Sequence, residues 1–245
     1  MSLYLIGIGL WDPTDITIKG LEAVKRCEHV YLESYTSKLG CTIEDLEALY
    51  GKKIIIADRD TVENADRILD DARSSDTALL IIGDIFSATT HIDIALRAWE
   101  IGIKVHCIHN TSILIAIGEI GIDLYKFGRT VSIPFHNKNV SSPAEMIRKN
   151  LSMNLHSLVL LDLSPKDEKY MTSSDAAAYL LANGFDREQR VIACAGIGSS
   201  GQEICYSSLR KISERYLSKI PQCLIIPANL HFMEEKALSR FADMD

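Results

Sequence analysis

Hydrophobic positions in the first 110 residues follow two alternating patterns, short unbroken apolar runs and stretches in which apolar residues recur every three or four positions. Unbroken runs of four to eight residues predict buried strands, and the spaced pattern predicts amphipathic helices. Buried strands that alternate with helices are typical of parallel βαβ units, in which helices cover both faces of one sheet. The strands are expected at residues 3–9, 29–33, 52–58, 77–84 and 103–109.

The stretches between these strands carry helix signals. Residues 17–28 place Ile18, Leu21 and Val24 on one face, and residues 92–99 are closed by Gly102, a common helix-ending residue. A third helix is expected to start at a capping box formed by Asp60 and Glu63 and to continue to Ala72.

The second half of the chain has a different texture. A helix is expected at 112–121. Another begins at Ser142-Pro143-Ala144-Glu145, a capping box into which the linker-like residues 136–143 run. A further helix is expected at 173–184, closed by a glycine. Residues 203–208 alternate with period two, which predicts antiparallel pairing and a mixed sheet. The strands of this half are expected at 128–135, 156–163, 190–196, 203–208 and 223–227.

The whole pattern predicts the α/β class with two α/β domains, residues 1–110 and 111–245, the first built on a mainly parallel sheet and the second on a mixed one.

Composition narrows the class of protein. The 245 residues are 47% hydrophobic and 24% charged, as in ordinary globular proteins, and the net charge of −7 argues against a broad nucleic-acid surface. No apolar run approaches the ~18 residues of a membrane span, and the first ten residues lack the basic start of a signal peptide. Six cysteines without a C-x-x-C pair are expected to be reduced thiols in a cytoplasmic protein. His106, Cys107 and His109 are expected to be core or loop residues, so no metal is predicted.

Two glycine clusters follow predicted strands. The first, Gly7-Ile8-Gly9, has Asp12 where a dinucleotide fingerprint needs its third glycine. The second, residues 196–201, matches the fingerprint, but a strand-like segment follows it where a helix is required. We interpret it as a glycine-permitted loop between strands, and contact with a ligand of another kind stays open for both clusters.

Polar residues end three of the predicted strands. Asp84 follows 77–82, Ser112 follows the fifth strand with Thr111, and Asp162 ends the strand at 156–163. Ligands of open α/β sheets bind outside the carboxyl ends of strands, so Asp84 is either a helix cap or a ligand contact. Thr89, Thr90 and His91 either cap the next helix or line a site. No nucleophile elbow, P-loop or zinc-protease motif is present, so these residues indicate a small-molecule enzyme without naming its chemistry.

Segments along the whole chain resemble one family. The chain is similar to the diphthine synthases, members of the tetrapyrrole methylase superfamily, in LYLIGIGLWDPTDITIKGLEAVKRCEHVYLESYTS, GDIFSATTHIDI, IHNTSI, LYKFGRT, LHSLVLLDL, KYMTSSDAA and LIIPANLHFMEEKAL.

This resemblance implies an S-adenosylmethionine-dependent methyltransferase that methylates the amino group of the modified histidine on elongation factor 2 in diphthamide biosynthesis. It implies two α/β domains with the cofactor in the cleft between them, and a homodimer. From charge, spacing and hydropathy, no metal, nucleic acid or membrane partner is expected. The cofactor-binding positions that the resemblance implies are Leu10, Asp84, Ser87, Ser112, Ile113, Leu161, Ile197 and Gln222.

The chain also departs from the family pattern. Ile85 stands where proline is usual, Ser87 where an apolar residue is common, and Gly196 where an arginine is usual. Residues 136–143 replace a segment that often contains tryptophan. The last two departures bear on recognition of the substrate.

Some questions stay open at this point. His91, Asp84 and Asp162 are candidates for a general base, and no catalytic residue is assigned. The number of methyl groups is undetermined, although the short segment from Asp162 to Tyr170 has the length seen in archaeal members. The alternative functions are another methylase of the superfamily, such as one acting on a cobalamin precursor, and a non-catalytic protein that binds elongation factor 2.

Overall fold

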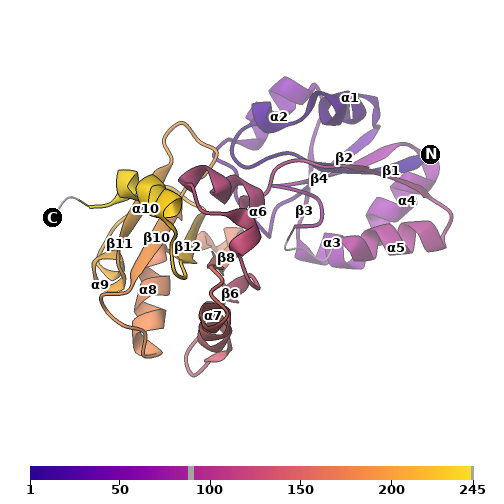
Figure 1. Ribbon diagram of the computed structural model, residues 1–245. Helices are drawn as coiled ribbons and strands as arrows, with labels where there is room; N and C mark the ends of the chain where they lie inside the picture. The colour runs from indigo at the N-terminus through magenta and orange to yellow at the C-terminus, as the bar shows by residue number, and fades with distance from the viewer. Residues whose placement is uncertain (88–90, 244–245) are drawn as a thin grey trace. The chain divides into compact units, whose positions relative to one another are not determined.

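The computed structural model describes residues 1–87 and 91–243, and within them the chain forms two compact units (Figure 1). The first unit is Met1–Ile113 and the second is Leu114–Asp245. Each unit has its own sheet and its own hydrophobic core, so each is described by itself. Thr89 and Thr90 lie outside the described residues.

The first unit contains a five-stranded sheet whose strand pairs are all parallel, as the continuous apolar runs predict. The strands run in the order β3-β2-β4-β1-β5, so β4 lies between β2 and β1. Because their carboxyl ends therefore meet at one edge, residues that follow β1, β4 and β5 are brought together. The strands are β1 (Ser2–Gly7), β2 (His29–Glu33), β3 (Ile55–Ala57), β4 (Thr77–Ile81) and β5 (Lys104–Ile108).

Helices cover both faces of this sheet (Figure 1). Leu3 and Leu5 of β1 belong to the core beneath α3, α4 and α5, whereas Ile6 and Ile8 belong to the core beneath α1 and α2. This split follows from the alternation of side chains along a strand. The helices are α1 (Ile18–Arg26), α2 (Ile43–Tyr50), α3 (Arg59–Asn64), α4 (Asp66–Ser74) and α5 (Ile92–Glu100).

Two local predictions for this unit are corrected. The helix expected from Asp60 to Ala72 is two helices, because Ala65 takes a left-handed conformation with φ 57° between α3 and α4. Its N-cap is Asp58, whose side chain accepts a hydrogen bond from the Thr61 N–H, so the capping box predicted at Asp60 is wrong. Helix α2 was not predicted, because Leu46 and Tyr50 alone among its residues are buried and leave little periodic signal.

The second unit contains a mixed five-stranded sheet in the order β11-β10-β12-β7-β6, which confirms the predicted mixture. Strands β6 and β7 pair in parallel, and the other pairs are antiparallel, including the predicted antiparallel strand β11. The second glycine cluster lies between β10 and β11, as a loop between strands. The strands are β6 (Val131–Ile133), β7 (Ser157–Leu161), β10 (Arg190–Ala195), β11 (Glu203–Ser208) and β12 (Gln222–Ile226), with a small hairpin of β8 (Leu163–Ser164) and β9 (Lys169–Tyr170).

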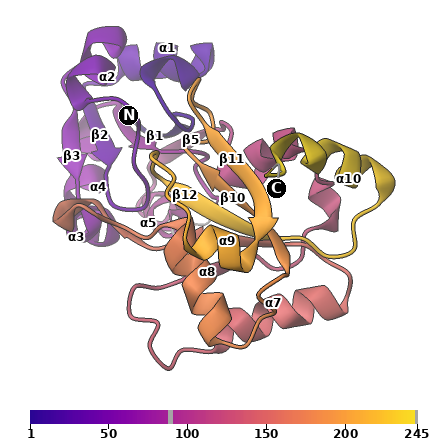
Figure 2. The ribbon, with the colours of Figure 1, turned by 90° about the vertical axis from the view of Figure 1, so that its left-hand side faces the viewer.

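The helices of the second unit, of which Figure 2 labels α7 to α10, differ from prediction in their ends and in their number. The N-cap of α7 is Ser141, not Ser142, and the helix expected at 112–121 is α6 followed by a 3-10 turn that ends at Gly121. Helices α9 and α10 were not predicted, because five to seven residues carry too little periodicity. The helices are α6 (Ile113–Ala116), α7 (Ser142–Ser152), α8 (Ser173–Ala182), α9 (Leu209–Ser213) and α10 (Phe232–Leu238).

Two further expectations concern cysteines and membranes. All six cysteines are free thiols in the structure, as expected. Among the described residues, no helix combines the length and apolar character needed to cross a bilayer.

Candidate functional site

Asp84 lies at the carboxyl edge of the first sheet, three residues after β4 ends at Ile81. Its Oδ2 accepts a hydrogen bond from the Asn110 N–H at 3.1 Å and lies 2.8 Å from His109 Nδ1, while its Oδ1 accepts from the Phe86 N–H at 3.3 Å. Burial alone would raise the pKa of this carboxyl, but the bonds from His109 and the two backbone N–H groups outweigh it and lower the pKa. Asp84 is therefore a carboxylate at neutral pH, and its side chain keeps 14% exposure through which a ligand can reach it.

The ends of β1 and β4 are joined by a glycine pair. The Gly83 N–H donates to the Gly9 carbonyl at 2.7 Å, and the Gly9 N–H donates to the Gly83 carbonyl at 3.4 Å. Gly9 has a φ of +82°, and a Cβ there would lie 2.3 Å from Cβ of Asp15, so no larger residue fits. The first glycine cluster thus brings the loop after β1 against the loop that carries Asp84.

Asp15 organises the loop after Gly9. Its Oδ2 accepts hydrogen bonds from the N–H groups of Leu10, Trp11 and Asp12 at 3.1, 2.7 and 3.4 Å. The N–H of Leu10, a predicted cofactor contact, is therefore already used within the loop. Its carbonyl and side chain remain for a ligand.

Ser112 is a polar side chain in an unusual state. It is 4% exposed, and its Oγ has no hydrogen-bond partner within the described residues. A Cβ on Gly83 would lie 3.8 Å from Cα and from Cβ of Ser112, so Ser112 stands at the same edge as Asp84. Ile113 follows at the start of α6. An unsatisfied buried hydroxyl costs about 1–3 kcal/mol, a cost that a polar ligand atom at this edge would remove.

Ser87 completes the set of predicted positions in the first unit. Its Oγ lies 3.5 Å from Asp84 Oδ1. The structure therefore brings Leu10, Asp84, Ser87, Ser112 and Ile113 to one edge of the first sheet. An ionised carboxylate beside an unpartnered hydroxyl suits a polar ligand that carries positive charge.

The predicted positions in the second unit also share one end of a sheet. Leu161 ends β7, Gln222 begins the antiparallel neighbour β12, and Ile197 follows β10 by two residues. The Gln222 side chain accepts from the Ser173 N–H and Oγ–H and donates to two backbone carbonyls. Its hydrogen-bonding capacity is used inside the unit, so only its backbone remains for a ligand.

The three candidates for a general base differ in their surroundings. His91 is 1% exposed, and burial lowers its pKa against the opposing charge of Glu33. Both carboxylate oxygens of Asp162 accept backbone N–H groups, Oδ2 from Phe135 and Oδ1 from Leu163. Asp84 is partly exposed but holds several donors. His91 is buried, and the carboxylate oxygens of Asp84 and Asp162 already accept backbone hydrogen bonds, so no base is assigned.

Two departures from the family pattern find a structural place. Ile85 is fully buried in the core beneath α3, α4 and α5, so it adds to packing where proline is usual. Gly196 has a φ of 60°, a left-handed conformation that a glycine adopts without strain, and its N–H donates to the Pro221 carbonyl.

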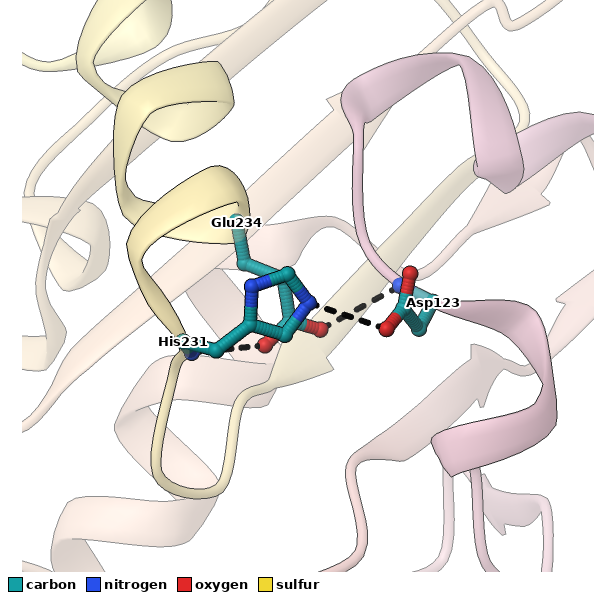
Figure 3. A group of neighbouring side chains, drawn as sticks. All are labelled: Asp123, His231 and Glu234. Carbon is teal, nitrogen blue, oxygen red and sulfur yellow. Dashed lines mark hydrogen bonds and ion pairs between the residues drawn. The ribbon is translucent and has the colours of Figure 1, made fainter.

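Sequence reasoning missed a polar network in the second unit (Figure 3). Glu234 of α10 is fully buried, and its Oε2 lies 2.9 Å from the Lys126 ammonium and accepts the His231 N–H, while its Oε1 lies 2.9 Å from His156 Nε2 and accepts the Asp123 N–H. Burial would raise the pKa of Glu234, but these donors, Lys126 first, lower it to about 2. No local pattern links these residues, because as many as 111 positions separate them.

This network resembles a metal centre only in its residue types. One ligand atom from each of Asp123, His231 and Glu234 lies within 4.8 Å of the others. Nδ1 of His231 accepts the Met233 N–H, and its Nε2 lies 3.0 Å from Asp123. The Lys126 ammonium already supplies the positive charge that a cation would bring. These contacts make the group a cap of α10 rather than an open ligand set.

His109 and Asn110 were also missed as site residues. His109 follows β5 directly, so its place at the carboxyl end of a parallel strand was the signal that could have identified it. Asn110 donates from Nδ2 to the carbonyls of Gly7 and Asp15, at 3.0 and 2.9 Å. It thereby ties the end of β1 to the loop that holds Leu10.

Comparison with known proteins shows which family the chain resembles. The family model described as Tetrapyrrole (Corrin/Porphyrin) Methylases matches residues 2–213. The diphthine methyl ester synthase of Schizosaccharomyces pombe is 40% identical over 98% of this chain and 94% of its own length. The diphthine methyl ester synthase of Homo sapiens is 41% identical over 98% of this chain and 95% of its own length. A solved diphthine synthase structure superposes with a TM-score of 0.93 at 35% identity, covering 99% of this chain and 96% of that one.

These matches run through both units and agree with the segments that carry the resemblance. The chain belongs to the tetrapyrrole methylase family, within its diphthine synthase branch.

Proposed function

We propose that this chain is an S-adenosylmethionine-dependent methyltransferase of diphthamide biosynthesis, acting on the modified histidine of elongation factor 2. The observation that carries the proposal is identity of 40–41%, over 98% of the chain, to two proteins named diphthine methyl ester synthase. A match of this length covers both units, whereas a shared fold alone would say little about substrate. A methylase of cobalamin precursors therefore receives no comparable support.

The edge of the first sheet fits the proposed cofactor. S-adenosylmethionine carries a sulfonium, an ammonium and two ribose hydroxyls. The edge offers an ionised Asp84 and the hydroxyl of Ser112, which has no partner among the residues that the structure describes. We assign Asp84, Ser87, Ser112, Ile113 and Leu10 to the cofactor, the last two through backbone groups. By resemblance Leu161, Ile197 and Gln222 of the second unit belong to the same set.

When bound, the cofactor supplies an activated methyl group, so the chain itself needs no nucleophile. The work left to its residues is to hold the methyl donor and the acceptor in line, which can contribute roughly 7–11 kcal/mol. Asp84 would hold the methyl donor through its negative charge, because the lowered pKa keeps this carboxyl ionised at neutral pH. Gly9 and Asp15 hold the adjoining loop in place.

The names of the relatives bear on the number of methyl groups. "Methyl ester" means that a carboxylate oxygen is methylated, in addition to the amino group that the resemblance implies. A carboxylate with an ordinary pKa near 4 is already an anion at neutral pH, so this transfer requires no general base. We therefore propose the ester-forming product for this chain, against the archaeal length of the segment from Asp162 to Tyr170.

The test is mass spectrometry of the modified peptide after elongation factor 2 bearing the unmethylated histidine derivative is incubated with enzyme and S-adenosylmethionine. We expect peptide masses raised by several methyl groups, one of which is lost after mild alkaline hydrolysis, since esters hydrolyse and N-methyl groups do not. A product unchanged by alkali would limit the activity to the amino group. An unmodified peptide would contradict the proposed function.

The non-catalytic alternative has its own test. A protein that only binds elongation factor 2 would not bind the cofactor product, so titration calorimetry with S-adenosylhomocysteine separates the two. We also propose a homodimer by resemblance, for which light scattering should give twice the 27.3 kDa of the chain.

A further inference from the structure

Helix α5 presents a row of apolar side chains that no part of its unit covers fully within the described residues. Ile92, Leu96 and Trp99 are 46%, 47% and 50% exposed, and their spacing of four and three places them in one row along the helix, the α5 stripe. The residues of α5 that are buried in the core, Ile94, Ala95 and Ala98, lie beside this row, because Ala95 is three residues from Ile92 and four from Trp99. The row therefore widens the apolar surface of α5 beyond the part that the core buries.

Exposed apolar side chains of the first unit are concentrated here. Of the eight large hydrophobic residues exposed in its described part, four lie in residues 92–101, the fourth being Ile101 at 41% exposure. Contiguous exposed apolar surface of this kind marks interaction sites, whereas scattered single residues do not. A half-exposed tryptophan in the row adds weight, because tryptophan is enriched among the residues that dominate binding energy.

The stripe is held on a rigid support. Arg97, on the same helix, donates to the Glu63 carbonyl at 3.1 Å and to Asp66 Oδ1 at 2.9 Å. It thereby ties α5 to α3 and α4, which lie on the same face of the sheet (Figure 1). A partner would meet a preformed surface and would lose little affinity to ordering it.

Acidic side chains outnumber basic ones on the three helices of this face. Helices α3, α4 and α5 together carry seven aspartates and glutamates against four arginines. Asp66 and Asp93 are 73% and 63% exposed, while the arginine nearest the stripe, Arg97, is engaged with both. The whole first unit has 18 acidic against 11 basic residues, which accounts for the net charge of −7. The surface therefore complements a partner that carries lysine or arginine around apolar residues.

We infer that the α5 stripe docks the protein substrate, through a segment of it that presents apolar side chains flanked by basic ones; this inference rests on the proposed function. The stripe starts eight residues after Asp84, directly after the segment assigned to the methyl donor. A second copy of the chain fits less well, because it would set one acidic rim against another. Permanent homodimer faces also bury about 2,000 Å² or more, which one row of half-exposed residues does not supply, whereas transient complexes bury less than about 1,200 Å².

The test compares Leu96→Glu and Trp99→Ala with the control Ile18→Glu. Ile18 is 79% exposed on α1, on the opposite face of the same sheet. With elongation factor 2 as substrate we expect KM to rise about tenfold or more in the two stripe variants, as for a binding hot spot, and to stay unchanged in the control. Affinity for S-adenosylhomocysteine, melting temperature and mass by light scattering should match the unaltered protein.

Charge gives an independent readout. Because the rim is acidic and the partner basic, KM of the unaltered enzyme should rise with salt between 50 and 300 mM, and Asp93→Asn should reduce that dependence. An unchanged KM in both stripe variants would overturn the inference. A change of mass in those variants would assign the stripe to a second copy and overturn it equally.

Failure of the proposed function is distinguishable from failure of the docking site. If the unaltered protein methylates nothing on elongation factor 2, the proposed function fails, and calorimetric binding of the factor then decides the docking site. Weaker binding by the stripe variants than by Ile18→Glu would support docking, and equal binding would refute it.

Discussion

Asp84 in the first unit and Glu234 in the second are carboxylates that each accept several hydrogen bonds, and the two differ in what they leave open. Asp84 stands at the carboxyl edge of parallel strands, with 14% of its side chain exposed. At the same edge the Ser112 hydroxyl has no hydrogen-bond partner in residues 1–87 and 91–243. Glu234 is fully buried, and both its oxygens are taken by donors that include Lys126 and His156. A lowered pKa marks both carboxyls. A lowered pKa therefore does not distinguish a ligand site from a structural network. A polar group that still lacks a hydrogen-bond partner does distinguish them.

The units also divide the charge of the chain unequally. The first has a net charge of −7, and the second has 15 acidic and 15 basic residues and is neutral overall. The charge attributed to the chain as a whole thus belongs to the unit that carries Asp84 and the α5 stripe. Average composition hides this contrast, which matters for recognition of a basic partner.

The largest effect is expected from a substitution that breaks the Glu234 network of the second unit. Glu234→Ala leaves the Lys126 ammonium and the His156 ring without their carboxylate, so we expect the free energy of unfolding to fall by about 3 kcal/mol or more. Urea denaturation measures it. Glu235→Ala, at the exposed neighbour on α10, should change stability by no more than about 0.5 kcal/mol. Equal losses in the two variants would show that the network adds nothing.

Asp84→Asn addresses the other carboxylate. The amide keeps the size of the side chain and loses its charge, so affinity for S-adenosylhomocysteine should fall about tenfold or more, as for a lost charged hydrogen bond. Stability should change far less than in Glu234→Ala, because the side chain lies at an open edge. Calorimetry and urea denaturation on the same preparation separate the two effects. Unchanged affinity would remove Asp84 from the cofactor site.

Acid should weaken both units through one buried histidine in each. Burial lowers the pKa of His91 in the first unit and of His156 in the second, despite the nearby carboxylates of Glu33 and Glu234. Near pH 6.5 these histidines therefore bind protons in the unfolded chain but stay neutral in the folded chain. The contribution of each neutral histidine to the free energy of unfolding is complete above pH 6.5. It is lost as the pH falls below 6.5, by at most about 1.4 kcal/mol per pH unit for each histidine.

Denaturation at pH 7.5, 6.5 and 5.5 measures this slope. His156→Gln should flatten part of it, since glutamine does not titrate. Stability that rises as pH falls through this range would contradict the assignment of neutral buried histidines.

The smallest effect belongs to Ser112→Ala. Because the Oγ has no partner within the described residues, its removal should leave stability unchanged or raise it by up to about 1 kcal/mol. Affinity for S-adenosylhomocysteine should fall a few fold, since the bound ligand loses one hydrogen bond. Thermal unfolding with and without the ligand reports both. A clear loss of stability without ligand would mean that the hydroxyl is satisfied inside the fold.

Local pattern predicted the strands well and helix ends poorly. The runs at 77–84 and 156–163 are β4 and β7, because an unbroken apolar run has few alternatives to a buried strand. The single helix expected through Ala65 is broken there, since a left-handed turn at an alanine has no signature in hydrophobic spacing. The Asp58 cap was missed for a similar reason, as Asp58 and Asp60 are both good cap residues and only the backbone path chooses between them.

The sequence by itself determined that the chain forms two sheets with helices packed on them and that the strands of the first sheet are parallel. It also determined the strand ends at which Asp84 and Ser112 stand. These features depend on neighbours within a few residues and on the rule that parallel strands share a carboxyl edge. The tertiary structure alone decided that His109 contacts Asp84 and that Glu234 joins Asp123, Lys126 and His156. It also decided that Ser112 is buried with no hydrogen-bond partner in the described part of the chain. Such contacts depend on which distant segments a fold brings within hydrogen-bond distance, and desolvation in the interior then sets their charge.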